Sequence, residues 1–238
     1  HLARWLASRN LVLNESKTQI LFIPAHRSVN PRVSVMCSGV QLAQVESAKY
    51  LGVHMDQDLK WTTMVNQIAK RAACKIAVLF RNRRCMPLPC RITYLKSLIL
   101  PDFLYASNCF SAGLTSHQLE RLERLLKRAV RCVYNAPFAS PSAPLYCQLR
   151  LHSLEVMYCH KLLGYTWRCL QGKCSTLLTD MFSPLNAGRA TRSQGNRALK
   201  FPVTKTSAGT HSASSQCVSL WNRLQPDIRK IPQYHRFM

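Results

Sequence analysis

The stretch Ser47-Ala48-Lys49-Tyr50-Leu51-Gly52-Val53-His54-Met55-Asp56 determines how the rest of the chain is interpreted. Its leucine, valine and methionine occupy every second position, and this period of two predicts a β-strand. Gly52 lies in the middle, where a glycine often marks a place at which another backbone comes close. Residues 33–42 alternate in the same way around a Ser38-Gly39 turn signal. We therefore expect this stretch to be one strand of a small antiparallel unit.

The residues upstream predict a short helix and a second strand. Apolar residues within the first six positions lie on one side of a helix that ends near Asn10. Residues 19–23, Gln-Ile-Leu-Phe-Ile, are apolar on both faces, and Pro24 follows them. A strand that is apolar on both faces is expected to be buried in a sheet.

Downstream, the apolar period changes from two to 3.6, which predicts helices. We expect one from Trp61 to Leu79, one from about Arg91 to Leu100, and one from Ser116, its N-cap, to Val133. Pro101 is expected to end or kink the second of them. Each helix has an apolar face, so together they predict a compact helical bundle.

The last hundred residues are expected to be a linker followed by a helical extension. Residues 135–144 are rich in Ala, Ser and Pro, which is typical of a linker. Residues 149–170 and 214–224 are expected to be helical. Residues 188–211 are polar, basic and poor in large apolar side chains, which favours a loop or disorder.

The chain is strongly basic. Its 238 residues carry 33 Lys plus Arg against 10 Asp plus Glu, a formal net charge of +23. Because 47% of the residues are hydrophobic, the chain can form a core, and the charge indicates a polyanionic partner, nucleic acid ahead of an anionic membrane. No apolar run approaches the ~20 residues of a membrane span. The chain begins at His1 without a signal-peptide pattern, so we expect an intracellular fragment.

Eleven cysteines, an odd number, are scattered without a repeated spacing. Several lie among apolar residues, as free buried thiols do, which favours a reducing compartment without a disulfide framework. A zinc site at Cys159, His160, Cys169 and Cys174 is an alternative, but its spacing matches no structural zinc motif. Packing in the core is the expected role of these residues.

Two of the expected helices carry basic faces. In the third, Arg121, Arg124, Arg128 and Arg131 line up opposite the apolar side. They would contact phosphates, or else form a solvated face with the i,i+4 pairs Glu120–Arg124 and Glu123–Lys127. In residues 70–84 no acid is nearby, which favours contact with nucleic acid. Lys75 falls inside the apolar arc, so it either snorkels or faces a charged ligand.

Several short motifs follow one another in a recognisable order. They are Asn14-x-x-Lys17-Thr18, Lys49-Tyr50-Leu51-Gly52-Val53-x-x-Asp56, Leu59-x-Trp61, a segment from Tyr94 to Pro101, Leu122-x-x-x-Leu126-Lys127-Arg128-Ala129-x-Arg131, and Leu220-Trp221-Asn222. In this order the chain resembles the C-terminal half of the reverse transcriptase of a LINE-type (non-LTR) retrotransposon, of the jockey-like kind. The resemblance covers nearly the whole chain.

The resemblance implies roles for two segments near the start of the chain. Lys17 would lie near the incoming nucleotide, where a lysine can protonate the pyrophosphate leaving group or stabilise its charge. The alternative is a surface lysine at the entrance of a strand. Tyr50, Leu51, Gly52 and Val53 would form the primer-grip hairpin, whose backbone holds the primer 3′ end. The alternative for Gly52 is a glycine at a bulge.

The resemblance also implies that residues 59–135 form the polymerase thumb, which follows the backbone of the template–primer duplex. Basic side chains would then contact phosphates. They are Lys70, Arg71, Lys75, Arg81, Arg83, Arg84, Arg121, Arg124, Arg128 and Arg131.

A polymerase also needs carboxylates that hold two divalent ions, Mg²⁺ in the parent enzyme. The family supplies them from an upstream aspartate and an aromatic-x-Asp-Asp hairpin, and neither occurs in this sequence. Asp58 is expected to cap the helix near Trp61, and a metal site of His54, Asp56 and Asp58 is disfavoured. We therefore expect no metal site and no polymerase activity from this chain alone.

The sequence thus predicts a mostly helical α+β chain. Residues 1–58 would be a palm remnant with the primer-grip hairpin, residues 59–135 a helical thumb, and residues 136–238 a linker and helical extension, partly disordered at 188–211. The expected function is that of a reverse transcriptase fragment that grips an RNA–DNA template–primer, in the nucleus and cytoplasm. The missing N-terminal polymerase half is an expected partner. The alternative is a stand-alone basic RNA- or DNA-binding or structural module.

Overall fold

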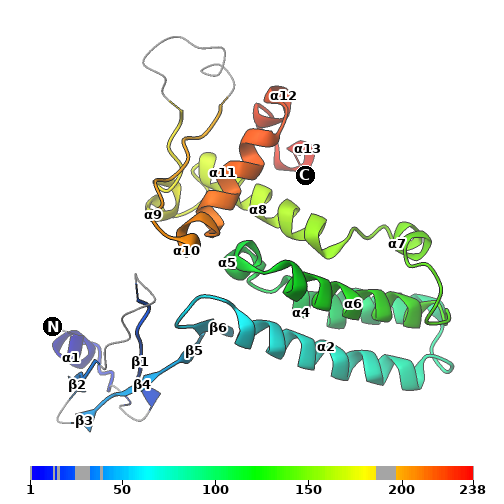
Figure 1. Cartoon of the computed structure of the whole chain (residues 1–238), viewed down its shortest axis with the longest axis horizontal. Coiled ribbons are helices and arrows are strands. Elements are labelled where there is room, and N and C mark those ends of the chain that lie inside the picture. The colour runs from blue at the N-terminus through cyan, green and yellow to red at the C-terminus, as the bar shows by residue number, and fades with distance from the viewer. Residues whose placement is uncertain are drawn as a thin grey trace. The chain divides into compact units, whose positions relative to one another are not determined.

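The computed structural model describes residues 2–12, 14, 17–24, 33–37, 40–185 and 197–237 (Figure 1). The chain divides into two compact units, His1–Met64 and Val65–Met238. Among the described residues the first unit holds short strands and one helix, and the second is helical apart from a single β-bridge. The mostly helical α+β class that the sequence predicts is therefore confirmed. The assignment of palm, thumb and extension stays a prediction.

The first unit contains helix α1 (Leu2–Ala7) and three two-stranded sheets. Strand β1 (Gln19–Leu21) pairs in parallel with β4 (Ala43–Val45). Strands β2 (Met36–Cys37) and β3 (Val40–Gln41) are antiparallel, as are β5 (Ser47–Tyr50) and β6 (Val53–Asp56). In the described residues both antiparallel sheets are therefore hairpins of neighbouring strands, and the parallel sheet joins segments further apart in the sequence.

The expectation of a buried strand at residues 19–23 is wrong. The strand ends at Leu21, Gln19 is exposed, and Ile20 and Leu21 are only half-buried. Ile23 lies beyond the strand and is 45% exposed. Within the described part of the chain β1 has β4 as its one paired neighbour, so its apolar faces are covered only in part.

The stretch Ser47–Asp56 is a hairpin and not a single strand, which corrects the sequence-based prediction. Leu51 (φ 45°) and Gly52 (φ 84°) form a two-residue turn, and two positive φ values are the signature of a type I′ turn. Tyr50 pairs with Val53, and Ala48 pairs with Met55. Residues of opposite parity therefore share a face of the hairpin, which a simple period of two cannot predict.

A substitution in this turn is expected to stabilise the protein. Gly52 suits its positive φ, but a leucine in the left-handed region is strained by about 1 kcal/mol or more. Asn-Gly is the preferred pair for this turn, so Leu51→Asn is expected to raise the free energy of unfolding by about 0.5–1 kcal/mol. Gly52→Ala at the next position is expected to lower it by a similar amount. Urea unfolding of both variants checks this, and a loss of stability in Leu51→Asn would contradict the turn assignment.

The second unit begins with a helical layer. Helix α2 (Thr62–Asn82) buries Met64, Ile68 and Leu79, on the apolar face that the sequence predicts. A continuous helical run follows, made of α3 (Leu88–Tyr94), the π-helical turn η2 (Leu95–Ile99) and α4 (Leu100–Leu104).

Pro101 neither ends this helical run nor interrupts it, because it lies in the first turn of α4, one residue after the π-helical turn begins to give way to it at Leu100. A proline lacks the N–H that a helix would use, and a local switch in hydrogen-bond spacing accommodates that loss. In the turn itself the N–H of Leu100 donates to the carbonyl of Leu95. The helix continues to Leu104, beyond the end that the sequence predicts.

Helix α5 (Ser107–Phe110) and the 3₁₀ turn η3 (Ser111–Gly113) lead into α6 (Ser116–Val133). The N-cap of α6 is Thr115 and not Ser116. Its hydroxyl accepts from the N–H of Gln118, whose side chain accepts from the N–H of Thr115. This reciprocal pair is a capping box, which fixes the start of the helix.

The remaining helices follow, and some of them pack against this layer. Helix α8 (Leu154–Leu170) begins five residues later than the helix predicted for 149–170. Helix α7 (Ala143–Leu149) precedes it, begins inside the segment expected to be a linker, and ends where Arg150 adopts a left-handed φ of 52°. The later elements are α9 (Thr176–Thr179), α10 (Ser207–Thr210), α11 (Ala213–Arg223), α12 (Pro226–Arg229) and α13 (Tyr234–Phe237). Figure 1 shows α8 beside α5 on one side and α11 on the other.

Part of the segment expected to be disordered, residues 188–211, is instead held in the fold. Residues 186–196 lie outside the described part of the chain. Leu199, however, is buried and forms a β-bridge with Pro184. The side chain of Asn222 accepts from the N–H of Leu199 at 2.9 Å and donates to its carbonyl at 2.8 Å. One amide side chain thus satisfies both backbone groups of a buried residue, as a neighbouring strand would.

Candidate nucleic-acid interface

The tip of the β5–β6 hairpin presents the residues expected to form a primer grip. Tyr50 is 66% exposed and Leu51 is 75% exposed, while Gly52 is half-buried. Val53 is buried and anchors the hairpin. The backbone of the turn is therefore accessible to a ligand. Val53, the last of the four predicted residues, packs inside the protein instead. The primer-grip role itself stays a prediction.

At its base the hairpin is joined to the start of α2 by Asp56. This residue is buried, and its Oδ2 accepts from the N–H of Thr63 at 3.2 Å. Asp56 therefore caps α2, and the prediction that Asp58 does so is wrong. Asp58 binds Lys60, with 2.5 Å between the carboxylate and Nζ. Burial acts to raise the pKa of Asp58, but the hydrogen bonds and charge of Lys60 hold it below the ordinary value.

Lys17 lies in a turn just before β1. Its N–H donates to the Asn14 side chain at 3.2 Å, and the Thr18 hydroxyl donates to the Asn14 carbonyl at 2.8 Å. The first motif is thus a local turn that Asn14 organises, with the Lys17 side chain exposed. Both the leaving-group role and the alternative of a surface lysine are compatible with this position.

Most of the basic residues of α2 and the turn after it are exposed to solvent, namely Lys70, Arg71, Arg81 and Arg84. Lys75 differs from them, because its Nζ lies 2.7 Å from Asp102 Oδ2 and donates to the Leu98 carbonyl at 2.8 Å. The expectation that no acid lies near this run therefore fails for this residue, and its predicted contact with nucleic acid stays a prediction. Lys75 ties α2 to the second helical run.

The face of α6 opposite the core carries the four predicted arginines. Arg121, Arg124 and Arg128 are exposed, and Arg131 is half-buried. Arg121 donates to Asn66 near the start of α2 at 2.6 Å. In the described part of the chain, neither Glu120–Arg124 nor Glu123–Lys127 forms an ion pair within 4.0 Å. The alternative of a salt-bridged solvated face therefore loses its specific support.

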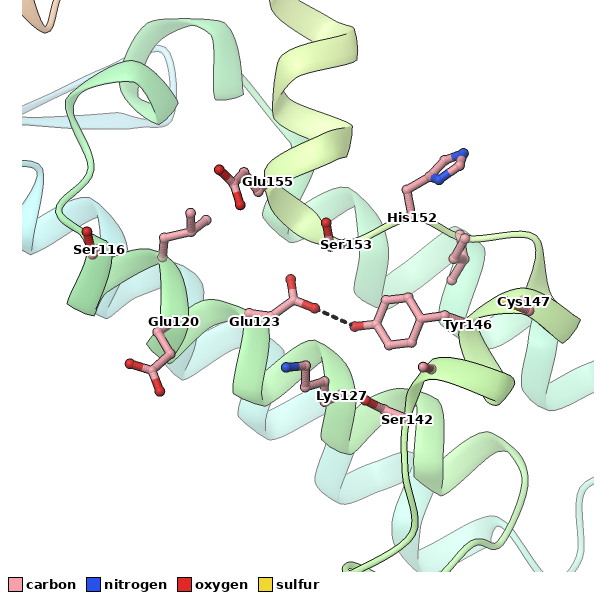
Figure 2. Close-up of a pocket in the computed structure, with 13 residues that line it drawn as sticks. Ser116, Glu120, Glu123, Lys127, Ser142, Tyr146, Cys147, His152, Ser153 and Glu155 are labelled. Atoms are coloured by element: carbon pink, nitrogen blue, oxygen red, sulfur yellow. Dashed lines mark hydrogen bonds between the residues drawn. The ribbon is translucent and has the colours of Figure 1, made fainter.

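Glu123 points to the other side of α6 and joins three helices. It lines a pocket of about 690 Å³ beside Glu120, Lys127, Tyr146, His152 and Glu155 (Figure 2). Its Oε1 accepts from the Tyr146 hydroxyl at 3.0 Å, and its Oε2 accepts from the N–H of Leu154 at 2.7 Å. Burial and the neighbouring carboxylate raise the pKa of Tyr146 far above its ordinary value, so the hydroxyl remains a donor.

These contacts give two neighbouring parts of the α6 surface different charge, although Lys127 also lines the pocket. The arginine face lies against solvent, whereas the pocket on the Glu123 side contains three glutamates. A polyanion would be attracted to the first and repelled by the second. The sequence predicted the arginine face, but it carried no signal that Glu123 caps α8, because the contact spans 31 residues.

The ends of α2 and α6 converge on a second group of basic side chains. Arg83 lies 3.5 Å from the Phe80 ring, and Arg131 lies 5.6 Å from the Phe138 ring. Arg131 Nε also donates to the Ser140 carbonyl at 2.8 Å. Sequence reasoning included both arginines but missed the two phenylalanines, since nothing in their local pattern distinguishes them from core residues.

No set of three His, Cys, Asp or Glu side chains in the described part of the chain could hold a metal ion. Two of the four residues of the alternative zinc site lie in or against the core. Cys169 is buried, and Cys174 packs against the core around Trp167 and Trp221. These two thiols therefore pack in the core, as expected.

Comparison with known proteins identifies the class that the chain resembles, the RNA-directed DNA polymerases of mobile elements. It is 24% identical over 152 residues to the Drosophila melanogaster protein named "Probable RNA-directed DNA polymerase from transposon X-element". It is 22% identical over 138 residues to the "RNA-directed DNA polymerase from mobile element jockey" of the same organism. The resemblance to non-LTR retrotransposon reverse transcriptases is therefore confirmed.

The matches cover 63% and 57% of this chain but only 16% and 15% of the two relatives. The chain thus corresponds to a small part of each polymerase. No family model matches the chain, and no solved structure matches it. Among the residues that the structure describes, no helix is both long enough and apolar enough to span a membrane.

Proposed function

We propose that this chain is a nucleic-acid-gripping part of an RNA-directed DNA polymerase. The observation that carries the proposal is the exposed arginine face of α6, which forms no ion pair with the glutamates of its own helix. Unpaired guanidinium groups on a rigid helix are suited to contact phosphates by charge and geometry. The similarity to mobile-element polymerases makes nucleic acid the polyanion of choice.

In this proposal the duplex lies along α6 and the adjacent exposed face of α2. The two helices run in the same direction, because Arg121 and Asn66 meet near their starts while Arg83 and Arg131 lie at their ends. Arg124 and Arg128 supply direct phosphate contacts, and Lys70, Arg71, Arg81 and Arg84 extend the positive surface. The exposed turn at Leu51 and Gly52 holds the primer 3′ end through its backbone, and Lys17 acts near the incoming nucleotide.

The first test compares ligands of equal length. The purified chain is expected to bind a recessed RNA–DNA primer–template more tightly than single-stranded RNA, because a thumb follows duplex geometry. Fluorescence anisotropy titrations at one fixed salt concentration measure both affinities. Equal, salt-sensitive binding to the two ligands would instead support a stand-alone basic nucleic-acid-binding module.

The second test addresses the arginine face directly. Each phosphate contact contributes roughly 0.9 to the slope of log affinity against log salt for duplex DNA. The double variant Arg124→Gln, Arg128→Gln is therefore expected to flatten that slope by roughly two. Arg150→Gln with Lys161→Gln is the matched control, because both residues lie outside α2 and α6. A slope equal to that of the control pair would reject the arginine face as the binding surface.

A further inference from the structure

The ends of α2 and α6 enclose a pocket of about 460 Å³ that shares Arg128 with the duplex interface and extends beyond it. Phe80 and Arg83 border it from the α2 side, Arg128 and Arg131 from α6, and Phe138 from the segment that follows α6. Its size lies in the range of small-molecule and nucleotide sites, about 300–1,000 Å³. None of the described residues that line it is acidic.

Two of its arginines are held in place by aromatic rings and backbone carbonyls. Arg83 stacks on Phe80 and donates to the Phe80 carbonyl. Arg131 lies over Phe138 and uses its Nε for the Ser140 carbonyl, which leaves its two terminal nitrogens for a ligand. Fixed guanidinium groups lose little conformational entropy when they bind a phosphate.

A third guanidinium group lies close by with unused donors. Arg91 Nε and Nη1 are buried and have no hydrogen-bond partner among the residues that the structure describes. Its charge reaches Cys132, which lines the pocket: burial raises the pKa of that thiol, and Arg83, Arg91 and Arg128 all act to lower it. Arg91 is not one of the residues that line the pocket, so its contribution is positive charge close to the site.

The aromatic rings at the rim are unusually open to solvent. Phe138 is 84% exposed and Phe80 is 49% exposed. Exposed aromatic rings beside cationic side chains are the arrangement by which proteins hold single-stranded nucleic acid, because every base has a face that can stack. A phosphate alone would use the arginines but not these rings.

We propose that this pocket binds one unpaired nucleotide of a strand that extends from the duplex on α2 and α6, with its base on Phe138 and its phosphate on the arginines. The inference rests on the proposed function, since the duplex interface brings the strand to the pocket. It adds a specific site for the single-stranded part of a template–primer. The occupant is recognised by an unpaired base and its phosphate together, without a sequence preference.

Three probes test this site at one fixed salt concentration: a blunt duplex, the same duplex with a short unpaired tail, and that duplex with an abasic tail of equal length. Phe138→Ala is expected to weaken binding of the tailed duplex by roughly 5- to 160-fold, the range for one stacked base. Its binding of the blunt duplex and of the abasic tail is expected to stay unchanged. Phe138→Trp keeps a stacking surface and is expected to restore the affinity for the tail.

Phe201→Ala is the matched control, because Phe201 is 55% exposed and lies outside the pocket. If Phe138→Ala binds the tailed duplex as the unchanged chain does, or weakens all three probes equally, the pocket proposal is wrong. Failure of the blunt duplex to bind, with Phe138-dependent binding of the tail retained, would reject the duplex interface and keep the pocket. Loss of binding to every probe by the unchanged chain would reject both.

Discussion

Trp221→Ala is expected to lower the free energy of unfolding by about 3–5 kcal/mol, the range for removal of a large aromatic side chain from a core. Trp221 is 1% exposed and packs in a core with Trp167, Phe182 and Leu199. Its indole N–H donates to the carbonyl of Arg197 at 2.8 Å. The substitution would open a cavity and leave that carbonyl without its donor, so both the packing and the hydrogen-bond contributions are lost.

Urea unfolding followed by far-UV circular dichroism measures this loss without relying on tryptophan fluorescence. Trp5→Ala is the control, because Trp5 is 55% exposed and its removal is expected to change stability by no more than about 0.5 kcal/mol. Asn222→Ala removes two hydrogen bonds to Leu199 and is expected to fall between the two. If Trp221→Ala were as stable as Trp5→Ala, the buried position of Trp221 would be wrong.

The same contacts give the Leu220-Trp221-Asn222 motif a physical role. Trp221 and Asn222 bind the backbone at Arg197 and Leu199, just after residues 186–196, which lie outside the described part of the chain. The sequence predicted that this segment is disordered. The motif instead binds part of it to the C-terminal core. Composition could not show this, because the two hydrogen-bonding partners lie 23 and 24 residues away.

Elsewhere the sequence predicted what depends on local periodicity. The apolar face of α2 and the arginine face of α6 both follow from a period of 3.6, and both occur as expected. Prediction from the sequence failed where a single residue changes the direction of the backbone. Leu51 and Arg150 adopt positive φ values that leucine and arginine rarely take, so neither the hairpin turn nor the break between α7 and α8 had a sequence signal.

At the candidate interface, too, local features could be predicted from the sequence and tertiary contacts could not. The exposed cations were predictable, because a basic face needs only the sequence and the helical period. Their partners were not: Asp102 neutralises Lys75 from 27 positions away, and Glu123 turns toward Tyr146 instead of Lys127. A charge on a helix face can be assigned to solvent, to a ligand or to a neighbour only when the tertiary contacts are known.

Glu123→Gln is expected to lower the free energy of unfolding by about 1.5–3 kcal/mol, the range for hydrogen bonds to a charged group. The carboxylate accepts from two donors, the Tyr146 hydroxyl and the Leu154 N–H. A glutamine of the same shape has one accepting oxygen, so its amide N–H₂ would face one of these donors. The first turn of α8 would also lose the negative charge that favours a helix N-terminus.

Urea unfolding of Glu123→Gln and Glu120→Gln separates this contact from a mere change in net charge. Glu120 lies on the same helix and is exposed, so its substitution is expected to cost no more than about 0.5 kcal/mol. A double-mutant cycle with Tyr146→Phe isolates the hydroxyl contact. Equal stability of the two glutamine variants would show that Glu123 does not hold α6, α7 and α8 together.

The same variant also separates stability from binding. The carboxylate of Glu123 is directed to Tyr146 and Leu154, away from the exposed arginines Arg124 and Arg128. Under conditions in which Glu123→Gln remains folded, its salt dependence of nucleic-acid binding is expected to match that of the unchanged chain. The arginine double variant is expected to show the reverse, a flattened salt slope with little loss of stability, since both arginines are exposed. That pair of opposite results would follow only if one side of α6 holds the fold and the other holds the ligand.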